Sequence, residues 1–382
     1  MGHNQSRDIA VIGGGIGGLT AALACARRGA KVTVYEQAPA LTEVGAGLQI
    51  TPNGARALNA LGIDKALDAT GVTATAVVPM DALASEEITR FDLSVQTPPY
   101  RFYHRAALID ILARGCEAAG VVVKLGARIG GLNADGSFEA DGAVIRPTLT
   151  VGADGLHSVV RGLMNTPAKP FFTGQVAWRA MIKTDKLDPA ARIWMAPGRH
   201  MVTYPLPGGR LNIVAVQARG QWADEGWHHP DDPGNLRMAF ADCGWEVKSI
   251  LGEVTETNLW GLFRHPVAEN WHAGSIAILG DAAHPTLPFL AQGANLAIED
   301  AYVLARCCDE AESVDEGLHD YQQKRRARVV KAIDTANKNA RNYHLGGMQR
   351  IVAHAGLRAM GKVAPTAFLN RLGWLYDHDV TE

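Results

Sequence analysis

The spacing of apolar positions near the start of the chain predicts a strand, a helix and a second strand. Asp8–Ile12 is a short β-branched run, Leu19–Arg28 is rich in helix formers with small residues on one face, and Lys31–Tyr35 is again β-branched. Gly29 is well placed to end the helix. The pattern therefore predicts a β-α-β unit with a right-handed crossover and buried parallel strands.

The pattern changes between about residues 170 and 265, where short runs alternate apolar with polar residues. Antiparallel strands are expected at Gln175–Thr184, Arg192–Met195, His200–Leu206 and Leu211–Gln217. The α/β pattern resumes with a strand at Ser275–Leu279, followed by a helix over about residues 293–309 and further helices after residue 318. Lys324–Arg328 is interpreted as a solvated helix face.

These patterns predict an α/β protein in which a Rossmann-like domain carries an inserted antiparallel β-sheet domain and C-terminal helices. The expected ranges are 1–75, 98–168 and 270–345 for the Rossmann-like domain, 76–97 and 169–269 for the β-rich domain, and 346–382 for a C-terminal helical segment.

The composition narrows the class of protein. The 382 residues are 47% hydrophobic and 20% charged with a net charge of −2, which argues against disorder and against a nucleic-acid or anionic-membrane partner. No apolar run approaches the roughly 18 residues of a membrane span, and the N-terminus does not resemble a signal peptide. The five cysteines form no Cys-x-x-Cys pair. We expect a cytoplasmic protein with reduced thiols.

Gly13-x-Gly15-x-x-Gly18 lies between the first strand and the helix. In such a turn the first glycine permits the tight bend, the second lets a pyrophosphate approach the backbone, and the third lets helix pack on strand. Glu36 ends the second strand, where its carboxylate is expected to bind the ribose hydroxyls of an adenosine.

Two more turns follow predicted strands farther along the chain. One is Gly152-Ala-Asp154-Gly155, and the other is Gly280-Asp281. Three strand-end turns suit one long cofactor lying across the edge of a sheet. Asp154 also has a purely structural alternative, in which it and Ser158 cap the following helix.

With these turns the chain resembles the single-component FAD-dependent aromatic hydroxylases, in the branch of salicylate hydroxylase, 3-hydroxybenzoate 6-hydroxylase and 6-hydroxynicotinate 3-monooxygenase. The resemblance covers about residues 7–345. It implies a tightly bound FAD, with NADH or NADPH as a transient co-substrate. The cofactor-binding residues that it implies are Gly13, Gly15, Gly18, Glu36, Arg105, Asp154, Asp281, Gly293 and Asn295.

The resemblance also implies an activity. The enzyme is expected to use O2 to hydroxylate a small phenolic aromatic acid, salicylate-like or hydroxybenzoate-like, through a flavin hydroperoxide. The alternatives are a hydroxynicotinate, a larger aromatic or polyketide substrate, or an FAD oxidase. Some members of the family are dimers, so a homodimer is an open possibility.

For the chemistry on the substrate, His200 and Tyr204 lie four apart in one predicted strand and so share a face. The resemblance implies that His200 is the base and Tyr204 a hydrogen-bond donor to the substrate. The alternative is a satisfied sheet histidine and a packed tyrosine. Gln49, Phe289, Leu290 and Gln292 are expected to line the substrate pocket.

Two further groups have both a purely structural and a functional interpretation. Arg179 is favoured as a surface charge at a strand edge, with a carboxylate anchor as the alternative. His228, His229, Asp231 and Asp232 cluster in a loop, but their spacing matches no closed metal site, so no metal is expected.

Overall fold

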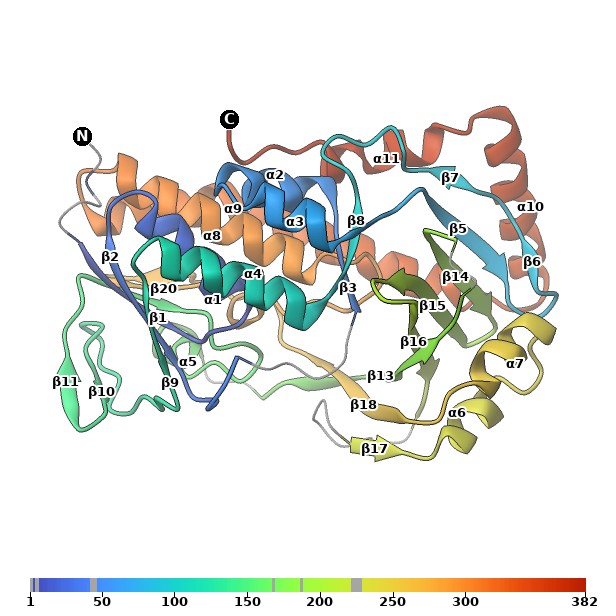
Figure 1. Cartoon of the computed structure of the whole chain (residues 1–382), viewed down its shortest axis with the longest axis horizontal. Helices are drawn as coiled ribbons and strands as arrows, with labels where there is room; N and C mark the ends of the chain where they lie inside the picture. The colour runs from blue at the N-terminus through green and yellow to red at the C-terminus, as the bar shows by residue number, and fades with distance from the viewer. Residues whose placement is uncertain (1–2, 4–6, 42–46, 167–168, 186–187, 221–228) are drawn as a thin grey trace.

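A computed structural model of the chain describes residues 3, 7–41, 47–166, 169–185, 188–220 and 229–382. Its first domain is built on a sheet with the strand order β19-β20-β12-β1-β2-β9 (Figure 1). β1 pairs in parallel with β2 and β12, and β12 pairs in parallel with β20. The strands of this sheet are β1 (Asp8–Ile12), β2 (Lys31–Glu36), β9 (Val122–Leu125), β12 (Leu149–Gly152), β19 (His272–Ala273) and β20 (Ile276–Ile278).

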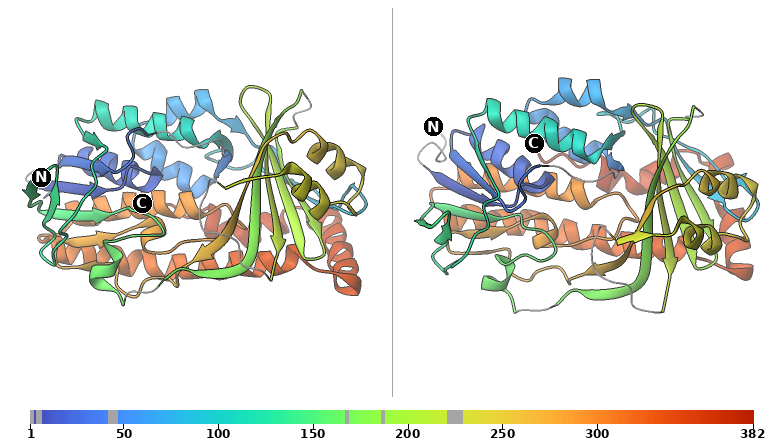
Figure 2. Two further views of the ribbon diagram at one scale, coloured as in Figure 1. Left: turned by 90° about the horizontal axis from the view of Figure 1, so that it is seen from below. Right: turned by 60° about the horizontal axis from the view of Figure 1, so that its bottom comes forward.

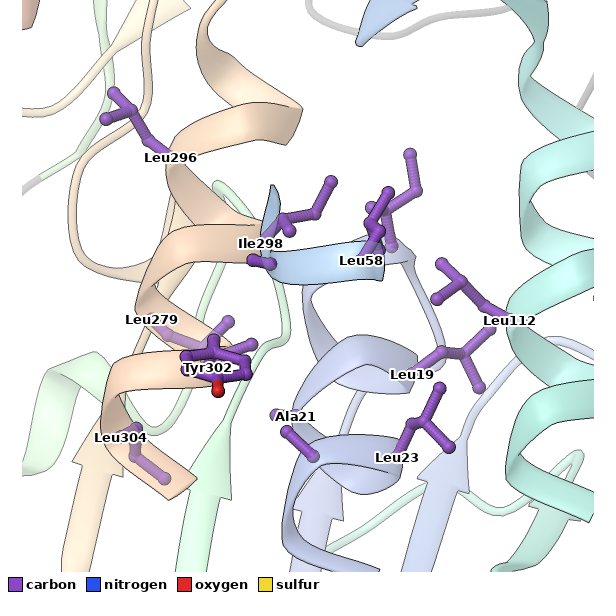
Figure 3. Close-up of a cluster of buried hydrophobic side chains, with 14 of the residues drawn as sticks. Leu19, Ala21, Leu23, Leu58, Leu112, Leu279, Leu296, Ile298, Tyr302 and Leu304 are labelled. Carbon is purple, nitrogen blue, oxygen red and sulfur yellow. The ribbon is translucent and has the colours of Figure 1, made fainter. Parts of the chain in front are cut away.

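Helix α1 (Ile16–Ala26) follows β1 and confirms the predicted β-α-β unit. It packs between α4 (Arg105–Ala118) and α8 (Gly293–Glu310). Figure 3 shows Leu19 and Leu23 of α1 directed toward Leu112 of α4, while the small Ala21 lies on the side of α8. All these side chains are buried, so the small residues predicted on one face of α1 permit close helix packing.

The second sheet has the order β17-β18-β13-β16-β15-β14-β5-β6, and β7 also pairs with β5. The strands predicted between residues 175 and 217 are confirmed as β13 to β16, which pair as antiparallel neighbours. The strands are β5 (Ala76–Asp81), β6 (Glu86–Glu87), β7 (Phe91–Asp92), β13 (Phe171–Lys183), β14 (Ala190–Ala196), β15 (Arg199–Leu206), β16 (Arg210–Ala218), β17 (His229–Asp231) and β18 (Thr257–Arg264).

The two faces of this sheet have different neighbours. In both views of Figure 2 the sheet stands between the first domain and helices α6 (Pro233–Ala239) and α7 (Trp245–Gly252). Trp178, Trp194 and Met201 pack with residues of α6 and α7 on the outer side. The inner face of the sheet is directed toward the first domain.

The remaining elements connect and cover the two sheets. They are β3 (Gly47–Ile50), β4 (Val72–Thr73) and β8 (Arg101–His104), which form a small sheet, the hairpin β10 (Phe138–Ala140) and β11 (Ala143–Ile145), α2 (Pro52–Ala60), α3 (Asp64–Thr70), α5 (Arg161–Met164), the 3₁₀ turn η2 (Gly280–Ala282), α9 (Val314–Tyr343), α10 (Gly347–Val363) and α11 (Ala367–Tyr376). Within the described residues, no helix has both the length and the apolar character that a membrane crossing requires.

Helix α9 joins the two parts of the molecule. Tyr321 donates a hydrogen bond to the Ile278 carbonyl in the first sheet (3.0 Å), and near the end of the helix Ala340 packs with residues of the second sheet. The interpretation of Lys324–Arg328 as a solvated face is wrong for Arg325, which is 1% exposed. Its guanidinium lies 2.6 Å from Glu299 and 2.8 Å from Asp300, both buried on α8. The residue is charged because it neutralises carboxylates inside the protein.

This arrangement predicts a large loss of stability in Arg325→Met. Removing one partner of a buried ion pair leaves uncompensated charge and costs about 3–5 kcal/mol. The control is Lys324→Met at the exposed neighbouring position. We expect urea denaturation to show a clearly lower midpoint for Arg325→Met and a change within about 0.5 kcal/mol for the control. Equal midpoints for the two variants would contradict the role given to this ion pair.

Candidate active site

A cavity of about 790 Å³ lies between the first domain and the inner face of the second sheet. One wall is formed by the turns that follow β1, β12 and β20, together with the start of α8. The opposite wall is formed by β13, β15, β16 and β18. The three turns recognised in the sequence therefore open onto one space.

The three glycines of the first turn have separate structural roles. A side chain at Gly13 would place its Cβ 2.4 Å from the Ala153 carbonyl oxygen, and one at Gly18 would lie 2.0 Å from the Gly13 oxygen. Gly13 also has a φ of +105°, which favours glycine. Gly15 lines the cavity, and a Cβ added to it would meet no atom within 4 Å. The first and third glycines thus permit close packing, and the second leaves space for a ligand.

Glu36 lies at the end of β2 and lines the same cavity. Its carboxylate accepts hydrogen bonds from the amides of Gly14 (2.6 Å) and Ala38 (2.7 Å). These bonds hold the carboxylate at the end of the cavity that adjoins the glycine turn.

Asp281 and Arg105 line the cavity from two different elements, η2 and the first turn of α4. Asp281 is an exposed residue whose side chain opens into the cavity. The surrounding protein screens it from bulk water and raises its pKa, while His284 and Arg105 oppose the rise. Burial lowers the pKa of Arg105, and Asp281 opposes that shift. The two side chains thus form an electrostatically coupled pair beside the third turn.

Asp154 lies at the cavity but directs its carboxylate into its own turn. It accepts hydrogen bonds from the Ser158 hydroxyl (2.5 Å) and the Val159 amide (2.8 Å). This geometry corresponds to the capping alternative. Asp154 nevertheless lines the cavity, so its assignment to the cofactor stays a prediction.

The N-terminus of α8 opens onto the cavity at Gly293. Asn295 is not among the residues that line the cavity: its side chain accepts from the Thr51 amide (3.0 Å) and donates to the Gln49 carbonyl (3.0 Å). Gln292 does line the cavity, but its side-chain oxygen accepts a hydrogen bond from the Asn53 side chain (3.1 Å). Both side chains fasten the start of α8 to the segment after β3. Any contact of Asn295 with a cofactor is left to its main-chain amide.

These features fit FAD. Among the described residues, no side chain caps the first turn of α1 or of α8, and both helix starts lie at the cavity. Uncapped helix N-termini present amide donors and a positive dipole end to anionic groups such as a pyrophosphate. The space at Gly15, the fixed carboxylate of Glu36 and the polar pair Arg105–Asp281 all line this wall.

The opposite wall carries His200, Val202 and Tyr204, which are alternate residues of β15 and line the cavity together. The prediction that His200 and Tyr204 share a face is confirmed. Tyr204 is held by side-chain contacts with Gln49 and Asn212, and burial raises the pKa of its phenol. Gln49 lines the cavity as expected and accepts a hydrogen bond from Tyr100 (2.5 Å).

Arg179 of β13 also lines the cavity, so the favoured interpretation as a surface charge is wrong. Its guanidinium carbon lies 4.7 Å from the centre of the Trp260 ring, a cation–π contact. Burial lowers the pKa of Arg179 to about 10, so the group keeps its charge at pH 7. A fixed cation therefore faces the same space as His200 and Tyr204.

Phe289 and Leu290 do not line the cavity, and that expectation is wrong. The Phe289 amide bonds to the Leu287 carbonyl (2.9 Å), forming a tight turn that directs Leu287 and Pro288 to the cavity instead. Phe289 packs against the ring of His200, with 5.3 Å between ring centres. The chain reversal could not be read from the order of apolar residues.

Sequence reasoning missed most of the apolar wall. Val214, Val216, Trp260 and Leu262 line it at alternate positions of β16 and β18. Period-2 alternation was a usable signal for these residues. The sequence analysis also missed His344, which hydrogen-bonds to His200. No local pattern connects two residues that lie 144 positions apart.

The residues of the suspected metal cluster have other roles where they are described. Asp231 accepts a hydrogen bond from the Trp178 indole (2.7 Å), and Asp232 caps α6 by accepting from Gly234 (2.8 Å). His228 lies outside the described residues. In the part of the chain that the structure describes, no group of three or more potential ligands forms a metal site.

Comparisons with known proteins agree with this geometry. Residues 6–336 match the model of a family described as an FAD binding domain. The chain is 34% identical to 3-amino-4-hydroxybenzoate 2-monooxygenase of Streptomyces platensis, with 98% of this chain and 97% of that protein covered. It is 33% identical to 3-hydroxybenzoate 6-hydroxylase 1 of Aquipseudomonas alcaligenes, with 100% and 99% covered.

A solved structure, a substrate complex of salicylate hydroxylase, is also similar, with a TM-score of 0.82 and 25% identity over 99% of this chain and 97% of that one. These alignments extend over both walls of the cavity, since each relative covers nearly the whole chain. The chain therefore belongs to the FAD-dependent aromatic monooxygenases.

Proposed function

We propose that this enzyme hydroxylates a small phenolic aromatic acid, salicylate-like or hydroxybenzoate-like, using O2 and either NADH or NADPH as a transient co-substrate. The observation that carries the proposal is the composition of one wall. Arg179, His200 and Tyr204 face a common cavity from an otherwise apolar sheet, opposite the cofactor wall. A cation, a base and a phenol on an apolar surface are complementary to a flat aromatic ring that bears a carboxylate and a hydroxyl.

The names of the relatives support the same substrate class. Two relatives that align over nearly the whole chain act on 3-amino-4-hydroxybenzoate and on 3-hydroxybenzoate by their names. Both compounds combine a ring carboxylate with a ring hydroxyl. A 6-hydroxynicotinate 3-monooxygenase of Bordetella bronchiseptica is also related, at 31% identity, so the hydroxynicotinates belong in any substrate test.

On the cofactor side, we assign Gly15 and the first amides of α1 to the pyrophosphate and Glu36 to the ribose of the adenosine. Arg105 and Asp281 are assigned to the polar chain of the cofactor, and the amides that begin at Gly293 to the flavin ring. Bound FAD supplies the redox chemistry between the pyridine nucleotide and O2. The protein supplies orientation, charge and exclusion of water.

On the substrate side, Arg179 binds the carboxylate and Tyr204 donates a hydrogen bond to a polar group of the ring. His200 accepts the proton of the ring hydroxyl. Burial holds the pKa of His200 well below its usual value, so the imidazole is neutral at pH 7 and has one unprotonated nitrogen. Val214, Val216 and Leu262 keep the ring in an apolar setting.

A panel of phenolic acids tests the proposal directly. Salicylate, 3- and 4-hydroxybenzoate, aminohydroxybenzoates and hydroxynicotinates would be added to the flavin-loaded enzyme. The readouts are the rates of NADH and NADPH oxidation and the mass of the product. We expect at least one acid to stimulate oxidation and gain one oxygen atom. Oxidation that yields only hydrogen peroxide with every ring would indicate an oxidase and contradict the proposal.

Asp281→Ala is expected to weaken retention of FAD, because the variant removes the negative charge that is coupled to Arg105 and leaves the Arg105 charge more costly to bury. The measurement is flavin absorbance per protein after gel filtration. Asp110→Ala, on the exposed side of α4, is the matched control. Full flavin content in Asp281→Ala would remove this residue from the cofactor site.

Arg179→Met is expected to raise KM for the aromatic acid roughly 30-fold or more, the effect of losing about 2–5 kcal/mol from a buried charge contact. The corresponding ring amide, which has no carboxylate, should bind about equally to both enzymes. Arg192→Met on β14 is the control, because Arg192 pairs with Asp188 and lies away from the cavity. Equal losses for acid and amide would show that Arg179 does not recognise the carboxylate.

His200→Ala is expected to retain FAD but to separate NADH oxidation from hydroxylation. Loss of a general base lowers the rate of ring hydroxylation by roughly 10²–10⁴-fold. The ratio of product formed to NADH consumed gives the coupling. If coupled turnover is unchanged, His200 is not the base.

A further inference from the structure

Two histidines from distant parts of the chain form a direct pair beside the cavity. His200 Nδ1 lies 2.7 Å from His344 Nε2, and the two ring centres are 5.0 Å apart. His344 is the C-cap residue that follows α9, whereas His200 lies near the start of β15. At this distance one ring nitrogen donates a hydrogen bond to the other.

The backbone holds both rings in place. The Gly198 amide donates to the His344 carbonyl (3.1 Å), which ties the end of α9 to the turn before β15. Phe289 and Tyr343 pack on the His200 ring, with centres 5.3 and 5.2 Å away. The neighbouring charged residue on β15, Arg199, pairs with Asp242 instead. The pair is therefore built into the fold and is not a chance contact of mobile side chains.

The two rings differ in their surroundings. His200 is 1% exposed and lines the cavity. His344 is partly exposed, yet it is not among the residues that line the cavity. The pair thus joins a fully buried ring at the cavity to a ring of a partly exposed residue.

A single buried histidine is a poor site for holding a proton. An imidazolium in an apolar cavity is costly, and burial lowers the pKa of both His200 and His344, the latter to about 4. A proton that enters at His200 is easier to hold when it can move to a less buried site. His344 also lies at the C-terminal end of α9, where the helix dipole favours positive charge.

We propose that His344 relays the hydroxyl proton of the substrate between His200 and solvent. In the resting pair, His200 Nδ1–H donates to His344 Nε2, which leaves His200 Nε2 free to accept. The substrate O–H bond breaks as the His200 Nε2–H bond forms, and the Nδ1–H bond of His200 breaks as the Nε2–H bond of His344 forms. His344 then gives its Nδ1 proton to a solvent water, which leaves both rings neutral and protonated on Nε2. The same steps in reverse return a proton to the hydroxylated product and restore both tautomers.

This inference rests on the proposed function, because it deepens the role of His200 as base. His344 touches neither ring nor cofactor, and so it acts through His200. Its alternative is simple positioning, in which His344 only accepts a hydrogen bond and fixes the tautomer of His200. A side chain that accepts a hydrogen bond but carries no proton distinguishes the two roles.

The test compares His344→Gln, His344→Phe and the control His319→Gln, an exposed histidine of the same helix. Flavin-loaded enzyme is mixed with 3-hydroxybenzoate, or with whichever phenolic acid the panel identifies, in weak buffer containing a pH indicator. Stopped-flow absorbance follows release of the phenolic proton to solvent and appearance of the bound phenolate. Neither readout requires turnover.

We expect both His344 variants to slow proton release roughly 10- to 100-fold, less than the 10²–10⁴-fold cost of losing the base itself. The control should release protons at the wild-type rate. Recovery of the wild-type rate in His344→Gln would show positioning and overturn the relay. Unchanged rates in both variants would overturn it as well.

A second measurement does not depend on the substrate. Nitrogen-15 NMR of the ligand-free holoenzyme reports which nitrogen of His200 carries the proton. The relay requires protonation at Nδ1, and protonation at Nε2 would overturn it for any substrate. An enzyme with the Nδ1 tautomer that hydroxylates no phenolic acid would support the pair geometry while refuting the proposed function.

Discussion

Contact of backbone on backbone at the ends of β1 and β12 is the constraint on which the site depends. The Cβ of any side chain at Gly13 would lie 2.4 Å from the Ala153 oxygen, so the two turns can approach only because this residue is glycine. Their approach places the start of α1 beside the turn that contains Asp154. With β20 next to β12 in the sheet, the turn at Asp281 joins them. One missing side chain thus allows three turns to share a cavity.

The start of α8 is positioned by a different device. The Asn53 side chain donates to Gln292, Gln292 donates to the Thr51 hydroxyl, and Asn295 accepts from the Thr51 main-chain amide. Below them, Glu299 and Asp300 are neutralised by Arg325 from α9. Buried polar groups need such partners, and full networks hold a unique geometry. The amides at Gly293 can therefore stay directed at the cavity without a capping side chain.

The sequence revealed features that depend on local spacing. The glycine turn, Glu36, and the shared face of His200 and Tyr204 follow from periods of two or from short turns, and the structure has them where expected. Arg325 was misread because a charged run looks solvated until the carboxylates of another helix are known. The expected place of Phe289 in the pocket was wrong because a hydrogen bond from its amide to the Leu287 carbonyl reverses the chain there. The partnership of His200 with His344 depends on tertiary folding alone.

The electrostatics of the cavity explain why an anionic ring suits it. Arg179 and Arg105 are close enough that Arg105 lowers the pKa of Arg179, and Asp281 offsets mainly Arg105. Arg179 thus carries its charge in a buried setting, where an opposite charge interacts strongly with it. The neutral His200 adds no fixed charge beside it. A carboxylate that reaches Arg179 is stabilised by this interaction, and the same positive field favours the phenolate over the phenol. Binding and activation of the ring would then draw on one buried cation.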